Sequence, residues 1–361
     1  MGRDDRGATP MTPLSFGDLR GWTKDDQAAA FGAFRNGAGV LGDHPPKTRA
    51  LGIDAAALAG ILTRAGKLPA ELSPDSARSF FETEFVPHAV GDTAFFTGYY
   101  EPEVRGSILP TTEFQVPLLR TPADLVEIEP GTVAGLDMSF RFAGRTAGGF
   151  GEYADRGAIA AGALAGRGLE LVYLHDPVDA FFIHIQGAAR IRLGDGRLMR
   201  ATYAAKTGHP YTPIGKVLIE MGALSPGEVT MATIRAWLAA HPADAAGLMA
   251  RNRSYIFFRE AAVDDAALGP VAAANVPLTA GRSLAVDRLQ HAFHSPVWIE
   301  TTLPGGAACN RLMIAQDTGS AIVGPARGDI FFGSGDAAGA IAGSMRAGGR
   351  FIVFMPRGES P

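Results

Sequence analysis

Glycine and proline recur along the whole chain without a fixed period, and this pattern restricts the folds that are open to it. The 361 residues include 46 glycines and 24 prolines. A long helical bundle would not contain so many helix-breaking residues, and collagen needs glycine at every third position. Frequent turns between short strands account for the composition better, so we predict a β-rich fold. The length exceeds that of one average domain and predicts two.

Composition and charge exclude several classes of protein. With 47% hydrophobic and 19% charged residues, the chain can bury a large core and is not intrinsically disordered. Its net charge of −4 gives no basic excess, so we expect no nucleic-acid partner. The lone Cys309 excludes intramolecular disulfides and cysteine-based metal clusters. No apolar run predicts a transmembrane helix, and the first residues lack the apolar core of a signal peptide.

The predicted secondary structure changes at Phe95. Before it, helical spacing of apolar residues between capping residues predicts helices at 24–35, 54–64 and 73–86. After it, β-prone runs predict strands at 95–102, 169–174, 180–186, 255–259, 297–301, 311–316, 329–332 and 350–355, with a hairpin of 188–193 and 197–203. Two helices interrupt these strands, one at 214–221 and one that opens at a Ser225–Glu228 capping box and ends before Pro242.

Short motifs that match common cofactor-binding patterns lack the surrounding sequence that such sites require. Residues 333–338 fit a loose G-x-G-x-x-A pattern, but too few residues follow for a dinucleotide-binding unit. His291 and His294 are close in sequence but lack the H-E-x-x-H pattern of a zinc site. The chain also lacks a serine-hydrolase elbow and a Walker A loop. We therefore expect no cofactor and no metal.

Three aspartates adjoin apolar strands: Asp287, Asp317 and Asp329. Charged residues at such positions are uncommon unless they are paired or functional. Asp317-Thr318-Gly319 also fits a simple Asx turn, and spacing does not say which aspartates meet in space. Because all three fall in one short β region, a shared carboxylate site is the more attractive hypothesis.

Aromatic and amide side chains provide a second feature. Sugar rings stack on aromatic faces and form hydrogen bonds with amides and hydroxyls, so this inventory suits a glycan-binding groove. The same aromatics would equally fill a barrel core, and both interpretations stay open. The residues concerned are Tyr99, Tyr100, Glu101, Gln186 and Tyr255.

Five motifs together resemble the MltA family of lytic murein transglycosylases. Three of them are FTGYYEP at 96–102, DPVDAFF leading to QG at 176–187, and NRSYIFFRE at 252–260. The other two, PLTAGRSLAVD at 277–287 and QDTG through GDIFFGSG at 316–335, resemble the family's 3D module, which is named for three aspartates. The resemblance runs in register from about Phe95 to Pro356.

The resemblance implies a mainly β fold with flanking α-helices, in which a double-psi β-barrel domain carries a smaller inserted β domain. Residues 1–102 and 251–361 would form the barrel domain with its N-terminal helices, and the 3D module would span about 252–356. Residues 103–250 would form the inserted β-rich domain. A long groove between the two domains would hold a glycan strand.

The resemblance also implies a lyase-type enzyme that cleaves the β-1,4 bond between N-acetylmuramic acid and N-acetylglucosamine and leaves a 1,6-anhydromuramic acid end. One aspartate of the family acts alone as acid and then base. The matching residue is Asp329, with Asp317 as its close catalytic companion and Asp287 in support. The implied substrate-binding residues are Tyr99, Tyr100, Glu101, Gln186, Tyr255 and Ser320.

Elementary chemistry agrees with a single acid–base group. Protonation of a poor leaving group needs a carboxylic acid with a raised pKa. The muramic acid C6 hydroxyl can then attack its own C1, with the large effective molarity of an intramolecular reaction. Two alternatives stay open: an inverting hydrolase on the same barrel, with Asp329 as acid and Asp317 as base, and a non-catalytic, expansin-like glycan-binding module.

Two segments depart from the family pattern. Ser320 stands where the family usually has a second glycine after Asp-Thr-Gly, and Ala188-Ala189 stand where it has Ser-Gly; both changes would alter substrate contacts. Family members are typically exported, often as lipoproteins. The resemblance therefore implies the periplasm or the inner face of the outer membrane, reached with a leader and an anchor that this sequence does not show. The implied partner is the glycan strand of peptidoglycan, with the cell-wall synthesis machinery as a further candidate.

Overall fold

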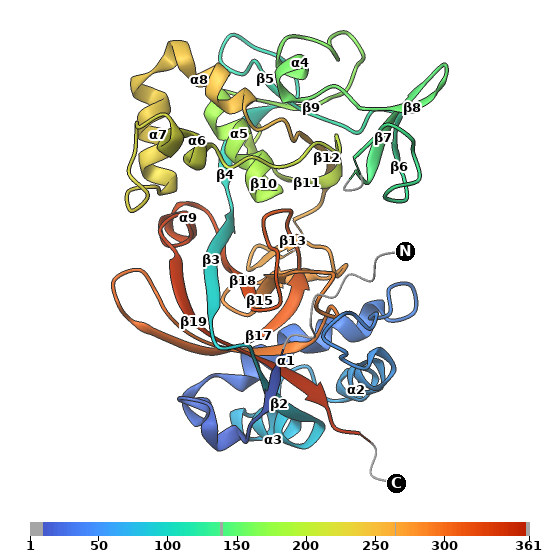
Figure 1. Ribbon diagram of the computed structural model, residues 1–361, viewed down its shortest axis with the longest axis vertical. Helices are drawn as coiled ribbons and strands as arrows, with labels where there is room; N and C mark the ends of the chain where they lie inside the picture. The colour runs from blue at the N-terminus through green and yellow to red at the C-terminus, as the bar shows by residue number, and fades with distance from the viewer. Residues whose placement is uncertain (1–9, 138–139, 264, 359–361) are drawn as a thin grey trace. The chain divides into compact units, whose positions relative to one another are not determined.

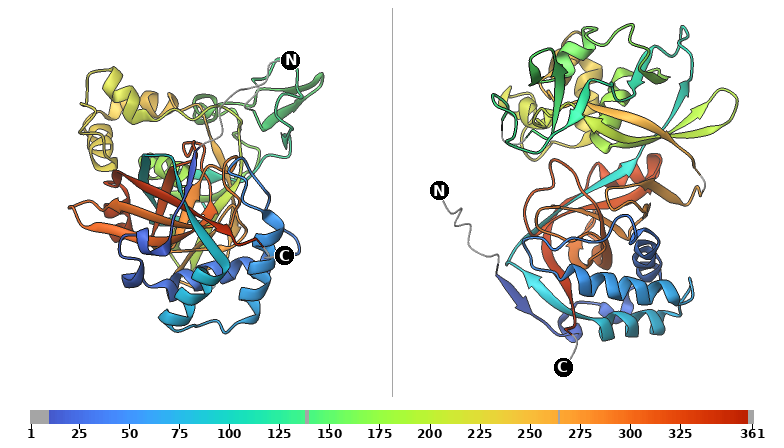
Figure 2. Two further views of the ribbon diagram at one scale, coloured as in Figure 1. Left: turned by 60° about the horizontal axis from the view of Figure 1, so that its bottom comes forward. Right: turned by 90° about the vertical axis from the view of Figure 1, so that its right-hand side faces the viewer.

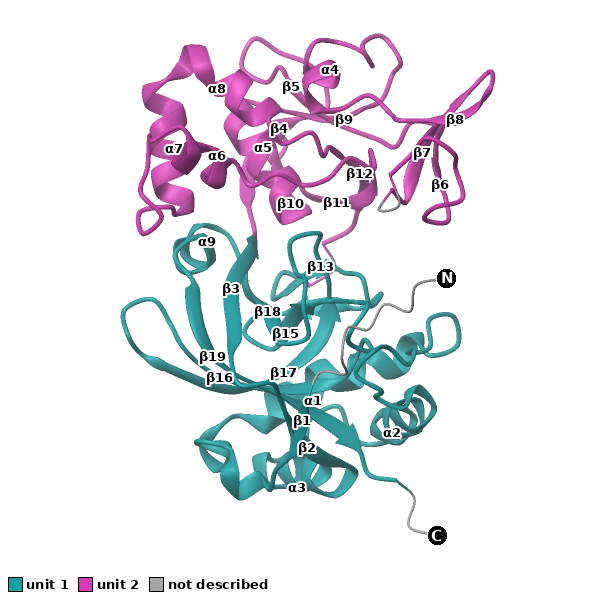
Figure 3. Ribbon diagram, in the orientation of Figure 1, with its two compact units in different colours: residues 1–100, 266–361 teal, residues 101–265 magenta. Residues whose placement is uncertain are grey.

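The computed structural model describes residues 10–137, 140–263 and 265–358, which form two compact units (Figures 1 and 3). Unit 1 contains the chain up to Tyr100 and again from Ala266 onward, and unit 2 contains Glu101–Asp265. The chain leaves unit 1 through β3 (Ala94–Glu101) and returns just before β13 (Leu268–Val271). Unit 2 is therefore an insertion in the sequence of unit 1.

A sheet that closes on itself is the framework of unit 1. The pairing of β19 (Arg346–Pro356) with β3 closes the part of this sheet that runs from β19 to β3 into a ring. β19 can do this because its residues 352–356 pair with β2, 349–353 with β16 and 346–349 with β3. In the described chain the sheet order is β1 (Met11–Pro13), β2 (Phe85–Val90), β19 (Arg346–Pro356), β16 (Pro296–Thr302), β17 (Ala308–Asp317), β15 (Ser283–Val286), β18 (Arg327–Ser334) and β3.

Helices near the N-terminus, blue to cyan in Figures 1 and 2, cover one side of this sheet. Side-chain caps start the three α-helices among them, because Asp26, Asp54 and Ser73 accept hydrogen bonds from N–H groups of the first turn. Buried phenylalanines join them to the sheet; Phe34 of α1 (Gln27–Arg35) and Phe85 of β2, for example, lie 5.9 Å apart edge to face. The helical elements are η1 (Phe16–Asp18), η2 (Trp22–Lys24), α1 (Gln27–Arg35), η3 (Asn36–Val40), α2 (Ala55–Lys67) and α3 (Pro74–Glu84). Elsewhere in unit 1 lie β14 (Pro277–Thr279), which pairs with β13, and α9 (Asp336–Ala342).

Unit 2 is built on a mixed sheet flanked by short helices. The hairpin predicted around Gly194–Gly196 is confirmed, with Ala188 opposite Thr202 and Arg192 opposite Leu198. The sheet order is β12 (Ile256–Ala261), β11 (Leu198–Lys206), β10 (Ala188–Leu193), β4 (Glu103–Ser107), β9 (Glu170–Leu174) and β5 (Val116–Leu119). A smaller sheet contains β6 (Leu125–Glu127), β7 (Phe142–Thr146) and β8 (Gly149–Gly151). The helices are α4 (Arg156–Ala160), α5 (Pro177–Gln186), α6 (Ile214–Glu220), α7 (Met231–Ala240) and α8 (Pro242–Ala250).

The predicted fold class, mainly β with a barrel, flanking helices and an inserted β-rich part, is confirmed, but two elements were predicted wrongly. Residues 180–186, predicted as a strand, belong to α5, whose N-cap is Asp176 and whose first turn contains Pro177. Most of this run is buried, so it lacks the alternation between apolar and polar faces that identifies a helix. The helix expected from Ser225 begins only at Met231, because Ser225 and Glu228 close a separate turn and Thr230 provides the cap.

Closure of the ring requires glycine at position 349. Gly349 pairs with Thr301 of β16 on one side and with Ala94 of β3 on the other. A Cβ atom there would collide with the carbonyl oxygen of Glu300, which is backbone and cannot rotate away. At Gly348 the nearest atom, the carbonyl oxygen of Ala94, would lie at an ordinary 3.7 Å.

We predict that Gly349→Ala lowers the free energy of unfolding by about 2 kcal/mol, because the added methyl group forces two paired strands apart. Urea denaturation at constant pH measures this change. Gly348→Ala is the matched control in the same strand and should change the free energy by less than about 1 kcal/mol. Equal effects of the two substitutions would contradict this account of the closure.

Candidate active site

Two of the three aspartates lie on either side of the same residue in unit 1. Ala285 of β15 pairs with Asp317 of β17 on one edge and with Asp329 of β18 on the other. Residues paired across strands project from the same face, and three adjacent strands place the two outer Cα atoms about 10 Å apart. The register therefore brings Asp317 and Asp329 together, although β15 is not adjacent in sequence to either residue.

Asp329 is half-buried and hydrogen-bonded. Its carboxylate accepts a hydrogen bond from the Thr97 hydroxyl, and that hydroxyl accepts one from Arg327 Nη2 at 2.6 Å. Burial raises the pKa of Asp329, whereas the Arg327 guanidinium and the Thr97 hydroxyl act in the opposite direction by stabilising the carboxylate. The chain thus holds a carboxyl group with a raised pKa beside two groups that stabilise its anion.

Asp317 is also half-buried, with a different set of partners. Its Oδ2 accepts a hydrogen bond from the Tyr99 hydroxyl at 2.9 Å, and its Oδ1 accepts one from the Thr318 N–H at 2.8 Å and one from the Ala273 N–H at 3.4 Å. Burial raises its pKa to about 6, against the effect of these hydrogen bonds, and the negative charge of Asp329 adds to the rise. The two carboxyl groups are therefore electrostatically coupled.

Strand β3 supplies a hydroxyl group to each aspartate. Thr97 and Tyr99 are two residues apart, so both project from the same face of the strand. Gly98 between them faces Phe332, and a Cβ atom there would lie 2.5 Å from Phe332 Cε2. The absence of a side chain at this position lets β3 approach β18 closely enough for Thr97 to reach Asp329.

Sequence reasoning did not single out Thr97 or Arg327 as site residues. Both stand in segments that it quoted, Thr97 in FTGYYEP and Arg327 directly before the GDIFF run. A β-branched hydroxyl residue within a strand is ordinary. Arg327 stands two residues before Asp329, a spacing that puts both side chains on one face of β18, but an arginine near an aspartate on a strand is commonly an ordinary ion pair. Their roles become visible only when β3 and β18 are seen to be neighbours.

Asp287 lies in a turn rather than on the paired strands. Its Oδ1 accepts a hydrogen bond from the Leu289 N–H at 2.9 Å, and its Oδ2 accepts one from the Gly324 N–H at 2.8 Å. It thereby joins the turn after β15 to the loop that follows Asp317. This geometry supports the loop, and a supporting role of Asp287 in catalysis stays a prediction.

The predicted substrate-binding residues of unit 1 differ in exposure. Tyr99 is half-buried against Asp317, with its ring 5.3 Å from that of Phe331. Tyr100 is buried against Gly339 of α9, where a Cβ atom would lie 2.7 Å from its ring. Ser320 is exposed in the loop after β17. Their contacts with a substrate stay predictions.

The remaining three predicted residues lie in unit 2. Glu101 is 1% exposed and accepts hydrogen bonds from the buried Arg190 and Arg200, so its removal would leave two cations unpaired in the interior. Tyr255 is buried with its ring edge-on to His184 at 4.2 Å. Gln186 is half-buried at the end of α5. A structural role is evident for Glu101 and Tyr255, and binding roles for all three stay predictions.

No three His, Cys, Asp or Glu side chains of the described residues gather as a metal ion would require.

The matches to models of protein families correspond to the two units of the chain. The model of the MltA-specific insert domain matches residues 95–259, which include nearly all of β3 and of unit 2. The model of the 3D domain matches residues 282–355 of unit 1. A crystal structure of a membrane-bound lytic murein transglycosylase from Agrobacterium tumefaciens is 46% identical, with a TM-score of 0.89, over 96% of this chain and 98% of that one. The chain belongs to the MltA family. The resemblance noted in the sequence is confirmed.

Two relatives from Escherichia coli extend the comparison. The membrane-bound lytic murein transglycosylase A of strain K12 is 32% identical over 268 residues, which are 72% of this chain and 65% of that protein. The match thus spans just under two thirds of that curated relative. A crystal structure of E. coli MltA with bound chitohexaose is 25% identical, with a TM-score of 0.71, over 99% of this chain and 98% of that one.

We predict that Tyr99→Phe raises the pKa of Asp317 above about 6, because the variant loses a hydrogen bond that favours the ionised carboxylate. A carboxyl ¹³C NMR titration, assigned with Asp317→Asn, measures the change. Tyr100→Phe removes the same hydroxyl from the neighbouring residue and should leave this pKa in place. An Asp317 titration that is identical in the Tyr99→Phe variant and the unmodified protein would show that the hydrogen bond does not act on the carboxylate.

Proposed function

We propose that the chain is a peptidoglycan lytic transglycosylase that cleaves the β-1,4 bond between N-acetylmuramic acid and N-acetylglucosamine. The observation that carries this proposal is the pair of half-buried, coupled aspartates on either side of Ala285. Family membership supports it, because the related proteins are named lytic murein transglycosylases. The bound chitohexaose in the E. coli relative supports an oligosaccharide ligand.

In the proposed reaction Asp329 acts first as an acid. Its proton passes to the glycosidic oxygen as the bond from that oxygen to muramic acid C1 breaks, and N-acetylglucosamine leaves as an alcohol. A raised pKa keeps the proton on the carboxyl group at a higher pH than an exposed aspartate would. Arg327 and Thr97 then stabilise the carboxylate that forms.

Asp329 next acts as a base. The C6 hydroxyl of the same muramic acid attacks C1, its proton returns to the Asp329 carboxylate, and the new C1–O6 bond gives the 1,6-anhydro ring. No water is consumed, and the acid is regenerated. An intramolecular nucleophile needs no second carboxylate to activate it, so Asp317 serves as an electrostatic neighbour, whose carboxyl group is coupled to that of Asp329.

The other sequence-based assignments enter the proposal unchanged. Asp287 supports the site, and Tyr99, Tyr100, Glu101, Gln186, Tyr255 and Ser320 bind the glycan. Residues 1–102 with 251–361 and residues 103–250 are the two domains expected from the sequence; the compact units differ from them by residues 101–102 and 251–265, which lie in unit 2. The names of membrane-bound relatives support a protein of the cell envelope, and we propose the periplasm or the inner face of the outer membrane. Among the described helices none has the length and apolarity needed to cross a bilayer.

We predict that Asp329→Asn lowers kcat by at least about 10²-fold, because the amide keeps the shape of the side chain but cannot donate and recover a proton. The assay is the release of muropeptides from purified sacculi, and thermal unfolding verifies that the variant is folded. Asp336→Asn is the control, since Asp336 is an exposed aspartate of the same unit. Near-normal turnover of a folded Asp329→Asn variant would remove this residue from the mechanism.

An inverting hydrolase is the second candidate, because the same register favours it. Inverting enzymes hold a water between two carboxyl groups about 6.5–9.5 Å apart, and the register places Asp317 and Asp329 on either side of one strand. The distance between the carboxyl groups does not distinguish the transglycosylase from the hydrolase. The source of the oxygen at the new end of the product does.

Digestion of sacculi in ¹⁸O-labelled water tests the reaction directly. We predict fragments with 1,6-anhydromuramic acid ends, about 18 Da lighter than hydrolysed ends and free of label, because the C6 hydroxyl replaces water. Mass spectrometry of the released fragments measures both properties, and a muramidase digest in the same water is the positive control for labelling. Stoichiometric ¹⁸O at the new reducing ends would overturn the transglycosylase and favour the hydrolase.

A further inference from the structure

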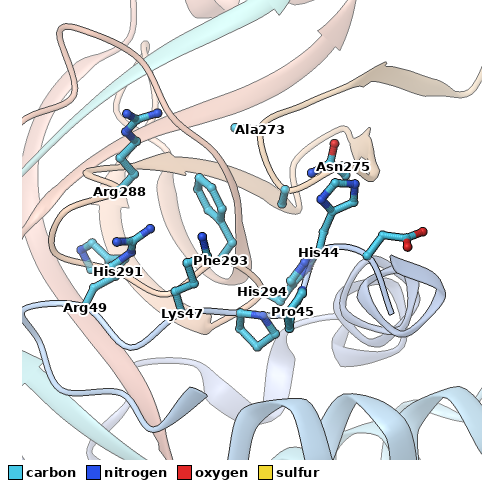
Figure 4. Close-up of a pocket in the computed structure, with 13 residues that line it drawn as sticks. His44, Pro45, Lys47, Arg49, Ala273, Asn275, Arg288, His291, Phe293 and His294 are labelled. Atoms are coloured by element: carbon cyan, nitrogen blue, oxygen red, sulfur yellow. The ribbon is translucent and has the colours of Figure 1, made fainter. Parts of the chain in front are cut away.

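Unit 1 contains a cavity of about 230 Å³ that the proposed mechanism does not use (Figure 4). Its lining comes from residues 43–49, after η3, and from residues between 273 and 294, on both sides of β15. The turn at its edge also belongs to the aspartate site. Ala273 donates its N–H to Asp317 Oδ1 at 3.4 Å, and Ala274 donates its N–H to the carbonyl oxygen of Gln316 at 3.0 Å.

Positive charge prevails in this cavity, although the whole chain has a net charge of −4. Of its described lining residues, Lys47, Arg49 and Arg288 are cationic, and Asp43 is acidic. Figure 4 shows the three cationic side chains toward one side of the view and His44 toward the other. Cations that gather around a cavity favour an anionic ligand.

The wall contains an unusual backbone. Asn275 and His294 have φ angles of 60° and 70°, and within the described ranges they are the non-glycine residues with positive φ. Such conformations are unfavourable for residues with a Cβ atom, and they concentrate at ligand sites. His294 is held tightly, since a Cβ atom at Gly37 would lie 2.7 Å from its Nδ1.

Two histidines of the wall have unused hydrogen-bonding capacity. His291 and His294 are each 1% exposed, and the Nδ1 atom of each is buried without a partner. Burial lowers both pKa values to about 4, so both rings are neutral near pH 7. His291 Nε2 lies 2.8 Å from the carbonyl oxygen of Pro325 and must carry the proton there, which makes Nδ1 an acceptor. The wall thus offers an acceptor as well as cations.

We propose that this cavity binds the acidic peptide stem carried by muramic acid, with Lys47 and Arg49 paired to a stem carboxylate. A peptide brings both carboxylates for the cations and N–H groups for an unfilled acceptor. The turn shared with Asp317 places the cavity next to the carboxyl groups at which the muramic acid reacts. This inference rests on the proposed function, since it assumes a muramic acid substrate.

Kinetics with two substrates test the assignment. The double variant Lys47→Gln/Arg49→Gln should raise KM for peptide-bearing glycan strands about tenfold and leave kcat unchanged. KM for strands from which an amidase has removed the peptides should not change. Lys24→Gln/Lys67→Gln removes two exposed charges of the same unit outside the cavity and is the matched control. An equal rise for both substrates, or no rise, would overturn the inference.

Binding without turnover separates this inference from the proposed reaction. Isothermal titration would use a soluble stem peptide with free carboxylates, the same peptide with amidated carboxylates, and inorganic phosphate. We expect the acidic peptide to bind the unmodified protein, and amidation or the Lys47→Gln/Arg49→Gln change to weaken binding at least about tenfold. Phosphate that binds as tightly as the peptide would reveal a general anion site and overturn the peptide assignment. The ¹⁸O result has no bearing on this titration, so the two hypotheses can fail separately.

Discussion

The four-residue strand β15 fixes the register on which the aspartate pair depends, and buried polar contacts hold that strand. Ser283 donates its hydroxyl to Gln316 Oε1 at 2.6 Å, and the Gln316 amide donates to the carbonyl oxygen of Ala33 in α1 at 2.7 Å. Arg282 forms an ion pair with Asp25 at 2.8 Å. A slip of one residue would turn the side chains of β15 to the opposite face and separate Asp317 from Asp329. The helical layer therefore controls the site through Gln316 and Arg282.

The aspartate pair lies where ionisation of its carboxyl groups is unfavourable. Because burial raises the pKa of Asp317 from 3.8 to about 6, ionisation of this residue is less favourable in the folded chain than in the unfolded one. Its contribution to stability accordingly falls as pH rises between these two values. Hydrogen bonds from Tyr99, Thr318 and Ala273 offset part of that cost. A carboxyl group with a raised pKa beside Asp329 is thus obtained at the expense of stability.

Local signals in the sequence identified most elements, and long-range pairing explains what they missed. The capping residues Asp54 and Ser73 predicted where helices begin, because a cap acts on its own first turn. The run 180–186 was wrongly predicted as a strand, since a helix buried on most sides has no periodic pattern. The three aspartates were found as candidates, but the meeting of Asp317 with Asp329 depends on the strand order β17-β15-β18. The residues adjacent in sequence to each aspartate do not determine that strand order.

The position of β19 in the ring has a consequence for biosynthesis. Translation proceeds from the N-terminus, and unit 2 is continuous in sequence, so it can collapse while later residues are still on the ribosome. The ring cannot close until β19 is available to both β16 and β3, and β3 carries Thr97 and Tyr99. A nascent or prematurely terminated chain therefore lacks the strand that holds these hydroxyls against the aspartates. The aspartate site therefore stays incomplete until synthesis of the chain is nearly finished.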